Sequence, residues 1–268
     1  HCTAVVADLT ALRAMPASLR AARAAVVLGA MISRGFTTVR DAGGADWGLA
    51  QAVDEGTVLG PRVLFSGRAL SQTGGHGDMR PREEGGGGGG GGCACACAAA
   101  AGIGRVCDGA DAVRLACREE LRLGSHFVKV MASGGVSSPT DALEHPQFSE
   151  EELRAACDEA GRKGSYVAAH AYTPAAISRA VACGARSVEH GNYLDAQTAR
   201  AMAAAGAFLV PTLVTYDAIV EHGAAAGFPR ALCDKAKGVC VAGALSLAAA
   251  RAAGVRTGFG SDLLGPMP

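Results

Sequence analysis

Four side chains that could do chemistry stand in or directly after short apolar runs of the chain. Residues 127–131 form a run that carries Lys129 and leads into small residues and glycines, and two later runs end in His170 and His190. Asp262 follows the last such run. Runs of this kind are typical of buried strands, where a lysine is costly unless it is neutralised or paired. One lysine, two histidines and one aspartate at successive strand ends predict a set of metal ligands.

Each of these residues also has a simpler interpretation. Lys129 could form a structural salt bridge or a Schiff base with a carbonyl substrate. As a neutral amine in a cavity it could instead react with carbon dioxide and become a carbamate that bridges two cations. His170 and His190, taken singly, are more often hydrogen-bonded core or loop histidines, and Asp262 could cap a turn. Their order along the chain favours ligation, with Asp262 also accepting a proton from the attacking water.

The elements that would hold these residues alternate between strand and helix. Strands are predicted at residues 36–41, 62–66, 127–131, 166–170, 187–190, 208–212 and 255–261, and helices at residues 16–33, 46–55, 108–123, 149–163, 174–183, 196–205 and 230–253. Alternation over 268 residues predicts an α/β fold, the (β/α)8 TIM barrel, with its active site at the C-terminal ends of the strands. Seven strands are counted, and the eighth is expected directly before His1.

A tract of low complexity interrupts this alternation. Residues 85–92 are all glycine and residues 93–101 are almost entirely alanine and cysteine, so a flexible insert is predicted at about residues 83–104. The alternation resumes after it, which makes residues 1–268 one partial barrel domain with a loop insertion. Another glycine-rich loop, at residues 71–78, presents His76. It lacks a phosphate-binding pattern and is predicted to be a substrate loop.

Composition limits the kind of partner. The chain has 25 basic and 25 acidic residues and no basic stripe, so neither nucleic acid nor an anionic membrane is predicted, and the ligand is expected to be a small molecule or dipeptide. No apolar run approaches the roughly 18 residues of a membrane helix. The cytoplasm is favoured as compartment but stays open, because the chain does not begin with Met and a leader could have been lost. The sequence does not determine the oligomeric state and is compatible with a homo-oligomer.

Several stretches resemble one protein family. They lie at residues 35–44, 73–78, 129–135, 169–172, 188–191 and 260–262, and they span nearly the whole chain apart from the glycine insert. In this order they resemble the amidohydrolase superfamily, in its imidazolonepropionase-like branch, and are most similar to the metal-dependent Xaa-Pro dipeptidases, or prolidases. The resemblance implies a metal-dependent barrel enzyme that cleaves an amide bond.

The resemblance also implies a role for each metal ligand. His1 looks like the second histidine of a His-x-His pair on the first strand, and Lys129 like a carboxylated lysine that bridges two divalent ions, zinc being expected. His170 and His190 look like the ligands of the second metal, and Asp262 like a ligand of the first metal that also shuttles a proton. The first histidine of the pair, a small β-rich domain and the last helix lie outside the sequence, so the chain is expected to be a fragment.

Two further residues acquire roles from the resemblance. His76 looks like a loop histidine that polarises the scissile carbonyl, and Tyr172 like a tyrosine that holds the substrate near the metals. From the sequence alone, His76 could equally face water and Tyr172 could be a half-buried barrel residue. Arg40 could bind the substrate carboxylate, or it could pair with the neighbouring Asp41.

The predicted reaction is hydrolysis of Xaa-Pro-type dipeptides by a metal-activated water, with release of proline's tertiary amide nitrogen. One alternative is hydrolysis of a cyclic amide such as imidazolonepropionate. A second is a Schiff-base enzyme that uses Lys129 and is indifferent to chelators. A third is a non-catalytic remnant that holds no metal.

Overall fold

The computed structural model describes residues 1–80, 102–138 and 141–265. The helices are η1 (Leu9–Arg13, 3-10), α1 (Ala17–Ser33), α2 (Trp47–Asp54), α4 (Ala110–Arg122), α5 (Glu150–Arg162), α6 (Pro174–Ala182), α7 (Ala196–Ala204), α8 (Leu213–His222) and α9 (Arg230–Ala252). The strands are β1 (Thr38–Asp41), β2 (Arg62–Phe65), β3 (Ala69–Ser71), β4 (Gly104–Val106), β5 (Val128–Met131), β6 (Val167–Ala171), β7 (Ser187–His190), β8 (Phe208–Val210) and β9 (Arg256–Thr257). No helix among these residues is long and apolar enough to cross a membrane.

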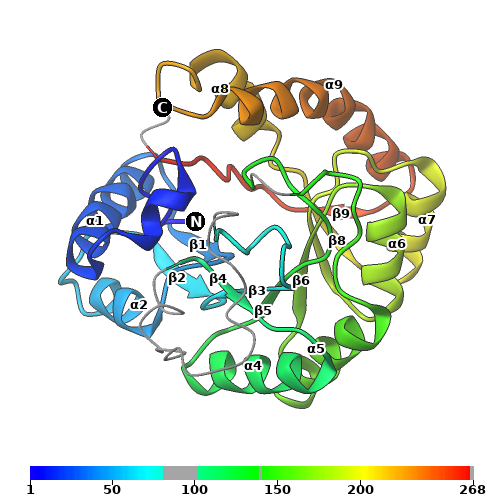
Figure 1. Ribbon diagram of the computed structural model, residues 1–268, viewed down its shortest axis with the longest axis horizontal. Helices are drawn as coiled ribbons and strands as arrows, with labels where there is room; N and C mark the ends of the chain where they lie inside the picture. The colour runs from blue at the N-terminus through cyan, green and yellow to red at the C-terminus, as the bar shows by residue number, and fades with distance from the viewer. Residues whose placement is uncertain (81–101, 139–140, 266–268) are drawn as a thin grey trace.

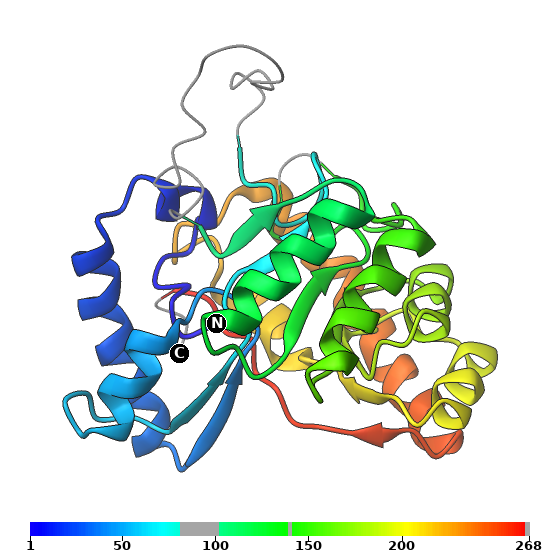
Figure 2. The same ribbon diagram turned by 90° about the horizontal axis from the view of Figure 1, so that it is seen from below.

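The strands form a parallel arrangement with the helices outside it (Figures 1 and 2). One sheet has the order β4-β3-β5-β6-β7-β8-β9, and β1 and β2 form a second, two-stranded sheet. Every ladder between these strands is parallel. The two sheets meet where the backbone N–H of His126 donates to the carbonyl of Phe65, over 2.8 Å. The predicted α/β barrel architecture is therefore confirmed.

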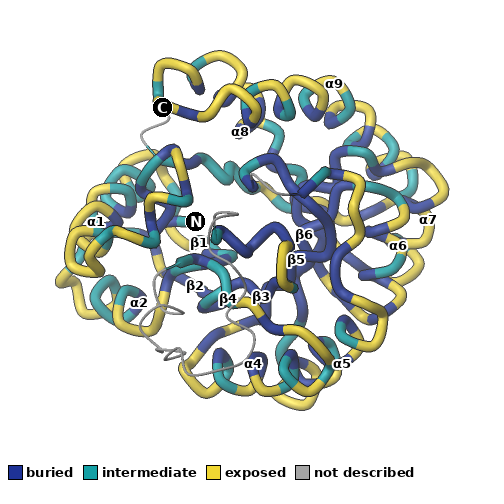
Figure 3. Tube along the Cα trace, in the orientation of Figure 1, coloured by how far each residue is buried: buried dark blue, intermediate teal, exposed yellow. Residues whose placement is uncertain are grey.

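The largest core cluster lies between the strands and the surrounding helices (Figure 3). It takes residues from β3, β5, β6, β7 and β8, such as Val128 and Val130 of β5, and packs them against α4, α5, α6 and α7. Because side chains alternate across a strand, the residues between them point to the barrel interior. Lys129 and Met131 of β5 accordingly line an interior pocket.

A second cluster lies over the mouth of the barrel. It joins Leu9 and Leu12, near the N-terminus, to Tyr216 and Ile219 of α8 and to residues of α9. These side chains are almost fully buried. The cluster narrows the entrance to the pocket and places α8 beside it.

Most predicted elements appear within a few residues of their expected bounds. The helix predicted to be capped by Ser149 is α5, and Ser149 and Glu152 form a reciprocal capping box. The insert predicted at about residues 83–104 falls mainly outside the described residues. Its last residue, Gly104, already belongs to β4.

Four elements were not predicted, namely the 3-10 helix η1, strands β3 and β4 and helix α8. Strands β3 and β4 have three residues each, and β4 begins at a glycine, so neither gives a clear period-2 pattern. Helix α8 was missed because the predicted strand at residues 208–212 was extended to Thr212. The strand ends at Val210, and Thr212 starts α8 from a left-handed backbone conformation (φ 47°) without a side-chain cap.

Candidate active site

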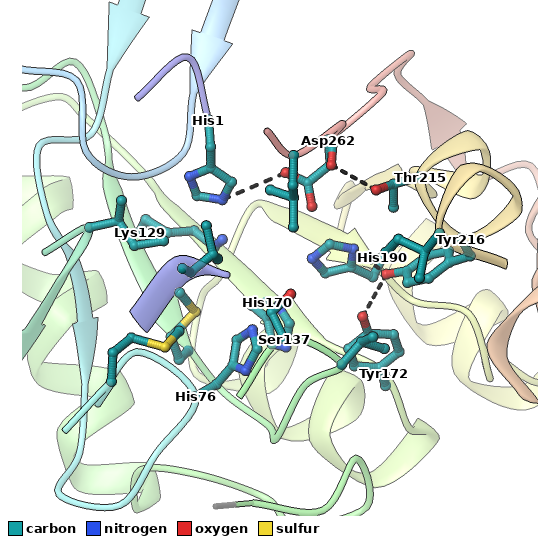
Figure 4. A pocket seen from close by; sticks show the side chains of 17 residues that line it. His1, His76, Lys129, Ser137, His170, Tyr172, His190, Thr215, Tyr216 and Asp262 are labelled. Carbon is teal, nitrogen blue, oxygen red and sulfur yellow. Dashed lines mark hydrogen bonds and ion pairs between the residues drawn. The ribbon is translucent and has the colours of Figure 1, made fainter. Parts of the chain in front are cut away.

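The residues expected to do chemistry converge on one interior pocket of about 30 Å³. It is lined by all seven predicted site residues, namely His1, His76, Lys129, His170, Tyr172, His190 and Asp262. Figure 4 shows the histidine rings around a common space, with the amine end of Lys129 pointing into it. The barrel topology thus brings together side chains that lie far apart in the sequence.

Lys129 is buried in the middle of β5. The residue is 2 % exposed, and within the described part of the chain its Nζ atom has no hydrogen-bond or ion-pair partner. Burial lowers the pKa of the amine, and the nearby carboxylates of Glu189 and Asp262 oppose that shift only in part. A lysine with a lowered pKa has a larger fraction of neutral, nucleophilic amine, which is the form that reacts with carbon dioxide or a carbonyl.

His170 and His190 each have one ring nitrogen already bound to the protein. Nε2 of His170 lies 3.1 Å from the carbonyl oxygen of Gly134, and Nδ1 of His190 lies 2.7 Å from both Thr212 Oγ1 and the Tyr216 hydroxyl. The two ring centroids are 4.6 Å apart. Nδ1 of His170 and Nε2 of His190 are therefore left for a ligand, as in histidines that bind metals while a second interaction fixes the ring.

Both imidazoles are neutral at ordinary pH. Burial lowers the pKa of His190 to about 4, and burial together with neighbouring positive charge lowers the pKa of His170 well below its usual value. A neutral imidazole retains the lone pair that ligates a metal ion. The lowered pKa values thus favour metal ligation by His170 and His190 over a role as positively charged imidazolium groups.

His1 and Asp262 form a second pair of donors. Nδ1 of His1 lies 2.8 Å from the carbonyl oxygen of Gly43, and its Nε2 lies 3.7 Å from Oδ1 of Asp262. Asp262 has a φ of 49° and His190 a φ of 76°, in the left-handed region that non-glycine residues rarely occupy. Strained backbone of this kind is concentrated at functional sites.

The donor set suits two cations better than one. Across the described ranges, no three histidine, cysteine, aspartate or glutamate side chains approach closely enough to hold an ion by themselves. The donors come instead as two pairs, His1 with Asp262 and His170 with His190, and the Lys129 amine reaches into the same pocket. A lysine-derived ligand shared between the pairs would give each ion a third donor.

His76 is buried against the pair formed by His170 and His190. Its ring stacks on His170 with a centroid separation of 4.2 Å, and its Nδ1 lies 2.9 Å from Ser138 Oγ. The residue is 8 % exposed, so it does not face water as the alternative interpretation had it. Burial, with the charge of nearby basic groups, lowers the pKa of His76 to about 3. Its role in catalysis stays a prediction.

Tyr172 is fully packed rather than half-buried. Its ring lies parallel to that of His190, at 6° and 5.2 Å, and its hydroxyl lies 2.5 Å from the hydroxyl of Tyr216. Tyr216 was not identified from the sequence because it lies on α8, the helix that was not predicted. Thr212, the other partner of His190, was taken for the end of a strand.

Arg40 pairs with Glu189 and not with Asp41, and its binding of a substrate carboxylate stays a prediction. Its Nη2 atom donates to both carboxylate oxygens of Glu189, at 3.0 and 3.1 Å, and it lines a neighbouring cleft of about 420 Å³ rather than the pocket. Asp41 instead accepts hydrogen bonds from the backbone N–H groups of Cys2, Gly43 and Ala45. The predicted pairing with Asp41 is wrong because successive residues of β1 point to opposite faces of the sheet.

The barrel fold and the candidate metal ligands in its pocket are typical of one protein family. A family profile described as "Amidohydrolase family" matches residues 3–266, and the chain belongs to that family. The resemblance drawn from the sequence is thereby confirmed.

Individual relatives are enzymes that act on amide bonds. A crystal structure of a prolidase complexed with N-methylphosphonate-L-proline is 52 % identical, with a TM-score of 0.93, and covers 100 % of this chain and 64 % of its own. A Xaa-Pro dipeptidase with methionine bound in its active site is 26 % identical, with a TM-score of 0.81, and covers 94 % of this chain and 61 % of its own. Ochratoxinase of Aspergillus niger is 38 % identical over 183 residues, which are 68 % of this chain and 38 % of that protein. The chain therefore spans less than two thirds of the length of each of these relatives.

Proposed function

We propose that this protein is a metal-dependent hydrolase that cleaves the amide bond of Xaa-Pro-type dipeptides. The observation that carries the proposal is the convergence of Lys129, two pairs of metal-ligating side chains and Tyr172 on one buried pocket. The 52 % identity to a prolidase solved with a proline phosphonate supports the substrate class.

The proposed cofactors are two divalent ions, zinc by preference, because imidazole nitrogen and carboxylate oxygen suit zinc. His1 and Asp262 would hold one ion, and His170 and His190 the other. Lys129 would bridge them as a carbamate. Its amine is buried and has no hydrogen-bond or ion-pair partner among the described residues, which supports that assignment. When bound, such ions activate water and polarise a carbonyl oxygen.

The protein's own groups then have distinct tasks. The Asp262 carboxylate accepts the proton of the attacking water and passes it to the leaving nitrogen, which in a Xaa-Pro dipeptide is proline's tertiary amide nitrogen. We assign to the hydroxyl of Tyr172 the task of donating to the carboxylate of proline, as the family resemblance implies. His76, whose ring stacks on His170, would contact the substrate at the scissile carbonyl.

The pocket wall adds a preference for apolar substrates. Its apolar lining residues include Leu9, Met79, Ile103, Val136, Ile219 and Leu264, and two polar residues, Ser137 and Thr215, also line it. An apolar wall stabilises an apolar side chain by removing its surface from water, at roughly 25 cal/mol per Å². We therefore expect dipeptides such as Leu-Pro to be cleaved in preference to those with a charged first residue.

The experiment that tests this function is a substrate comparison on the zinc-loaded protein. Proline release from Ala-Pro, Leu-Pro and Asp-Pro is measured beside ring opening of imidazolonepropionate, and borohydride is added to a parallel sample. We expect proline release, fastest from Leu-Pro, and no covalent trapping. Ring opening alone would support the cyclic-amide alternative, and trapping on Lys129 would support a Schiff base. Absence of every activity would contradict the proposal.

A further inference from the structure

One part of the pocket wall lies on the loop that follows β5. Val136 and Ser137 both line the pocket, and Figure 4 includes Ser137 among the side chains that surround it. Val136 is almost fully buried and belongs to the core cluster over the mouth of the barrel, together with Tyr172 and Tyr216. We call residues 135–138 the wall segment, because its two central residues form a face that a bound substrate would meet.

The wall segment is held from outside the pocket by Lys235 of α9. The ammonium of Lys235 donates to the main-chain carbonyls of Gly135, Ser138 and Asp141, at 3.1, 3.0 and 2.9 Å. Lys235 is not among the described residues that line the pocket. The first two carbonyls belong to the residues on either side of the pocket-lining pair, so these hydrogen bonds fix the main chain at both ends of the wall segment.

This arrangement uses every donor that a lysine side chain has. An ammonium group carries three N–H bonds, and each one reaches a different carbonyl oxygen. Hydrogen bonds from a charged donor are roughly twice as strong as those between neutral groups. Because all three donors reach main-chain oxygens, Lys235 determines where the backbone of the loop lies. We refer to these three hydrogen bonds as the Lys235 clamp.

Helix α9 also packs against the same loop through apolar side chains. Leu232 and Ala236, on either side of the lysine in α9, belong to one core cluster with Val136 and Leu143 of the loop. Apolar contact is non-directional, so it brings the helix and the loop together without fixing the direction of a side chain. The directed hydrogen bonds of the Lys235 clamp supply that orientation.

The base of the loop, near the metal ligands, is held without Lys235. The backbone N–H of Gln147 donates to the carbonyl of Ala132 over 2.9 Å. Gly134, two residues further along, carries the carbonyl that lies 3.1 Å from Nε2 of His170. Loss of the Lys235 clamp should therefore move the wall segment and leave this contact of His170 in place.

We propose that Lys235 is a positioning residue that sets the substrate preference of the pocket by holding Val136 and Ser137 in its wall. The inference rests on the proposed function, in which the wall contacts an apolar first residue of the dipeptide. When the clamp is lost, the wall segment moves away and the substrate's side chain keeps more of its surface in water. The effect falls on the binding of bulky substrates and not on the metal ligands.

The first test needs no turnover. Amide hydrogen exchange of the zinc-loaded protein is followed by NMR in Lys235→Met and in Lys237→Met, which removes an exposed ion pair on the same helix. The amide of His145 donates to the carbonyl of Ala142, next to a clamped residue, and the amide of Gln147 reports on the base of the loop. Loss of a bond to a charged group corresponds to about 10-fold or more, so we expect that acceleration at His145 in Lys235→Met alone. Equal rates in the two variants, or equal acceleration at both amides, would overturn the proposal.

The second test places the effect on the substrate. Values of kcat and KM for Leu-Pro and Ala-Pro are measured in Lys235→Met, in Val136→Ala and in the double variant. Lost apolar contact in a pocket is worth about 10-fold or more, so we expect KM for Leu-Pro to rise by about that factor in each single variant. KM for Ala-Pro should rise less and kcat should stay unchanged, as when binding alone is weakened. Because Lys235 acts through Val136, the double variant should be no worse than either single one. Additive losses, or an unchanged KM in Lys235→Met, would overturn the proposal.

Zinc affinity, measured by competition with a chelator, separates positioning from general damage to the site. It should be unchanged in Lys235→Met, because the contact between His170 and Gly134 does not depend on the clamp. A loss of zinc affinity as large as the rise in KM would overturn the proposal. If the unchanged protein cleaves neither dipeptide, the proposed function fails, and exchange at His145 still decides whether Lys235 holds the loop.

Discussion

The hydroxyl of Tyr216 lies 2.7 Å from Nδ1 of His190. The same hydroxyl contacts that of Tyr172, so one side chain of α8 fixes both a candidate metal ligand and the tyrosine expected to hold the substrate. Because Nδ1 of His190 is occupied in this way, only Nε2 remains for an ion. The helix that the sequence pattern did not reveal therefore orients part of the site.

Removal of this hydroxyl should weaken metal binding. Loss of the partner that orients a ligating histidine typically lowers metal affinity or activity by about 10- to 100-fold. For Tyr216→Phe we expect the lower part of that range, since Thr212 still contacts the same nitrogen. The measurement is zinc affinity by competition with a chelator. Tyr193→Phe, whose ring lies near Tyr172 outside this hydrogen-bond chain, is the control. Equal zinc affinities for the two variants would show that Tyr216 does not support His190.

Asp262→Asn should abolish proton transfer without unfolding the protein. Thr215 holds the main-chain oxygen of Asp262 rather than its carboxylate, over 2.8 Å, and asparagine tolerates the left-handed backbone at this position. We expect kcat to fall by about 10²- to 10⁴-fold with an unchanged urea midpoint. Asp234→Asn, on the exposed face of α9, should leave kcat unchanged. A variant that keeps more than a tenth of its activity would remove Asp262 from the mechanism.

Arg40→Met should affect stability rather than substrate binding. The Arg40 side chain is 29 % exposed, but its partner Glu189 is 8 % exposed and would be left as a buried, unpaired carboxylate. We expect unfolding free energy to fall by about 2 kcal/mol, and the double variant with Glu189→Gln to recover most of that loss. Urea unfolding and KM for Ala-Pro measure the two effects. A KM raised more than tenfold at unchanged stability would instead indicate that Arg40 binds the substrate carboxylate.

Buried thiols should make the fold sensitive to alkali. Burial raises the pKa of Cys117, on the buried face of α4, to about 12 from 9.0. Between these values the native state keeps a proton that the unfolded state loses, so stability is present below pH 9 and falls as pH rises toward 12. The fall is about 1 kcal/mol per pH unit for this thiol. Cys117→Ala should show a shallower decline in urea midpoint between about pH 9 and about pH 10. An identical decline would mean that Cys117 ionises equally in both states.

The sequence was sufficient to predict the barrel and the residues of the pocket. His170 and His190 could be predicted as neighbours from the sequence, because each ends a short apolar run and the strand ends of a parallel barrel meet at one rim. Helices such as α5 can be predicted from the capping residues at their N-terminus. His1, His76 and Tyr172 were found only through family resemblance, since no local pattern distinguishes them from ordinary loop or core residues.

Other features depend on tertiary contacts that local patterns do not encode. Arg40 is adjacent to Asp41 in sequence, yet the alternation of β1 directs it to Glu189, on a strand almost 150 residues away. The side chains of His76, Ser138 and Asp141 are joined by hydrogen bonds because the glycine-rich loop and the segment after β5 meet in space. Lys235 of α9 donates to the backbone carbonyl of Ser138, and the position of α9 relative to this segment depends on the tertiary fold as a whole.

The account depends most directly on metal-dependent cleavage of a Xaa-Pro dipeptide. The measurement is proline release from Leu-Pro by chelator-treated protein during stepwise addition of zinc in bicarbonate buffer. We predict no activity without metal and recovery that saturates at about two zinc ions per chain, as expected for a two-metal site. Proline release that persists unchanged in the metal-free protein, or that is absent from the fully loaded one, would contradict the account.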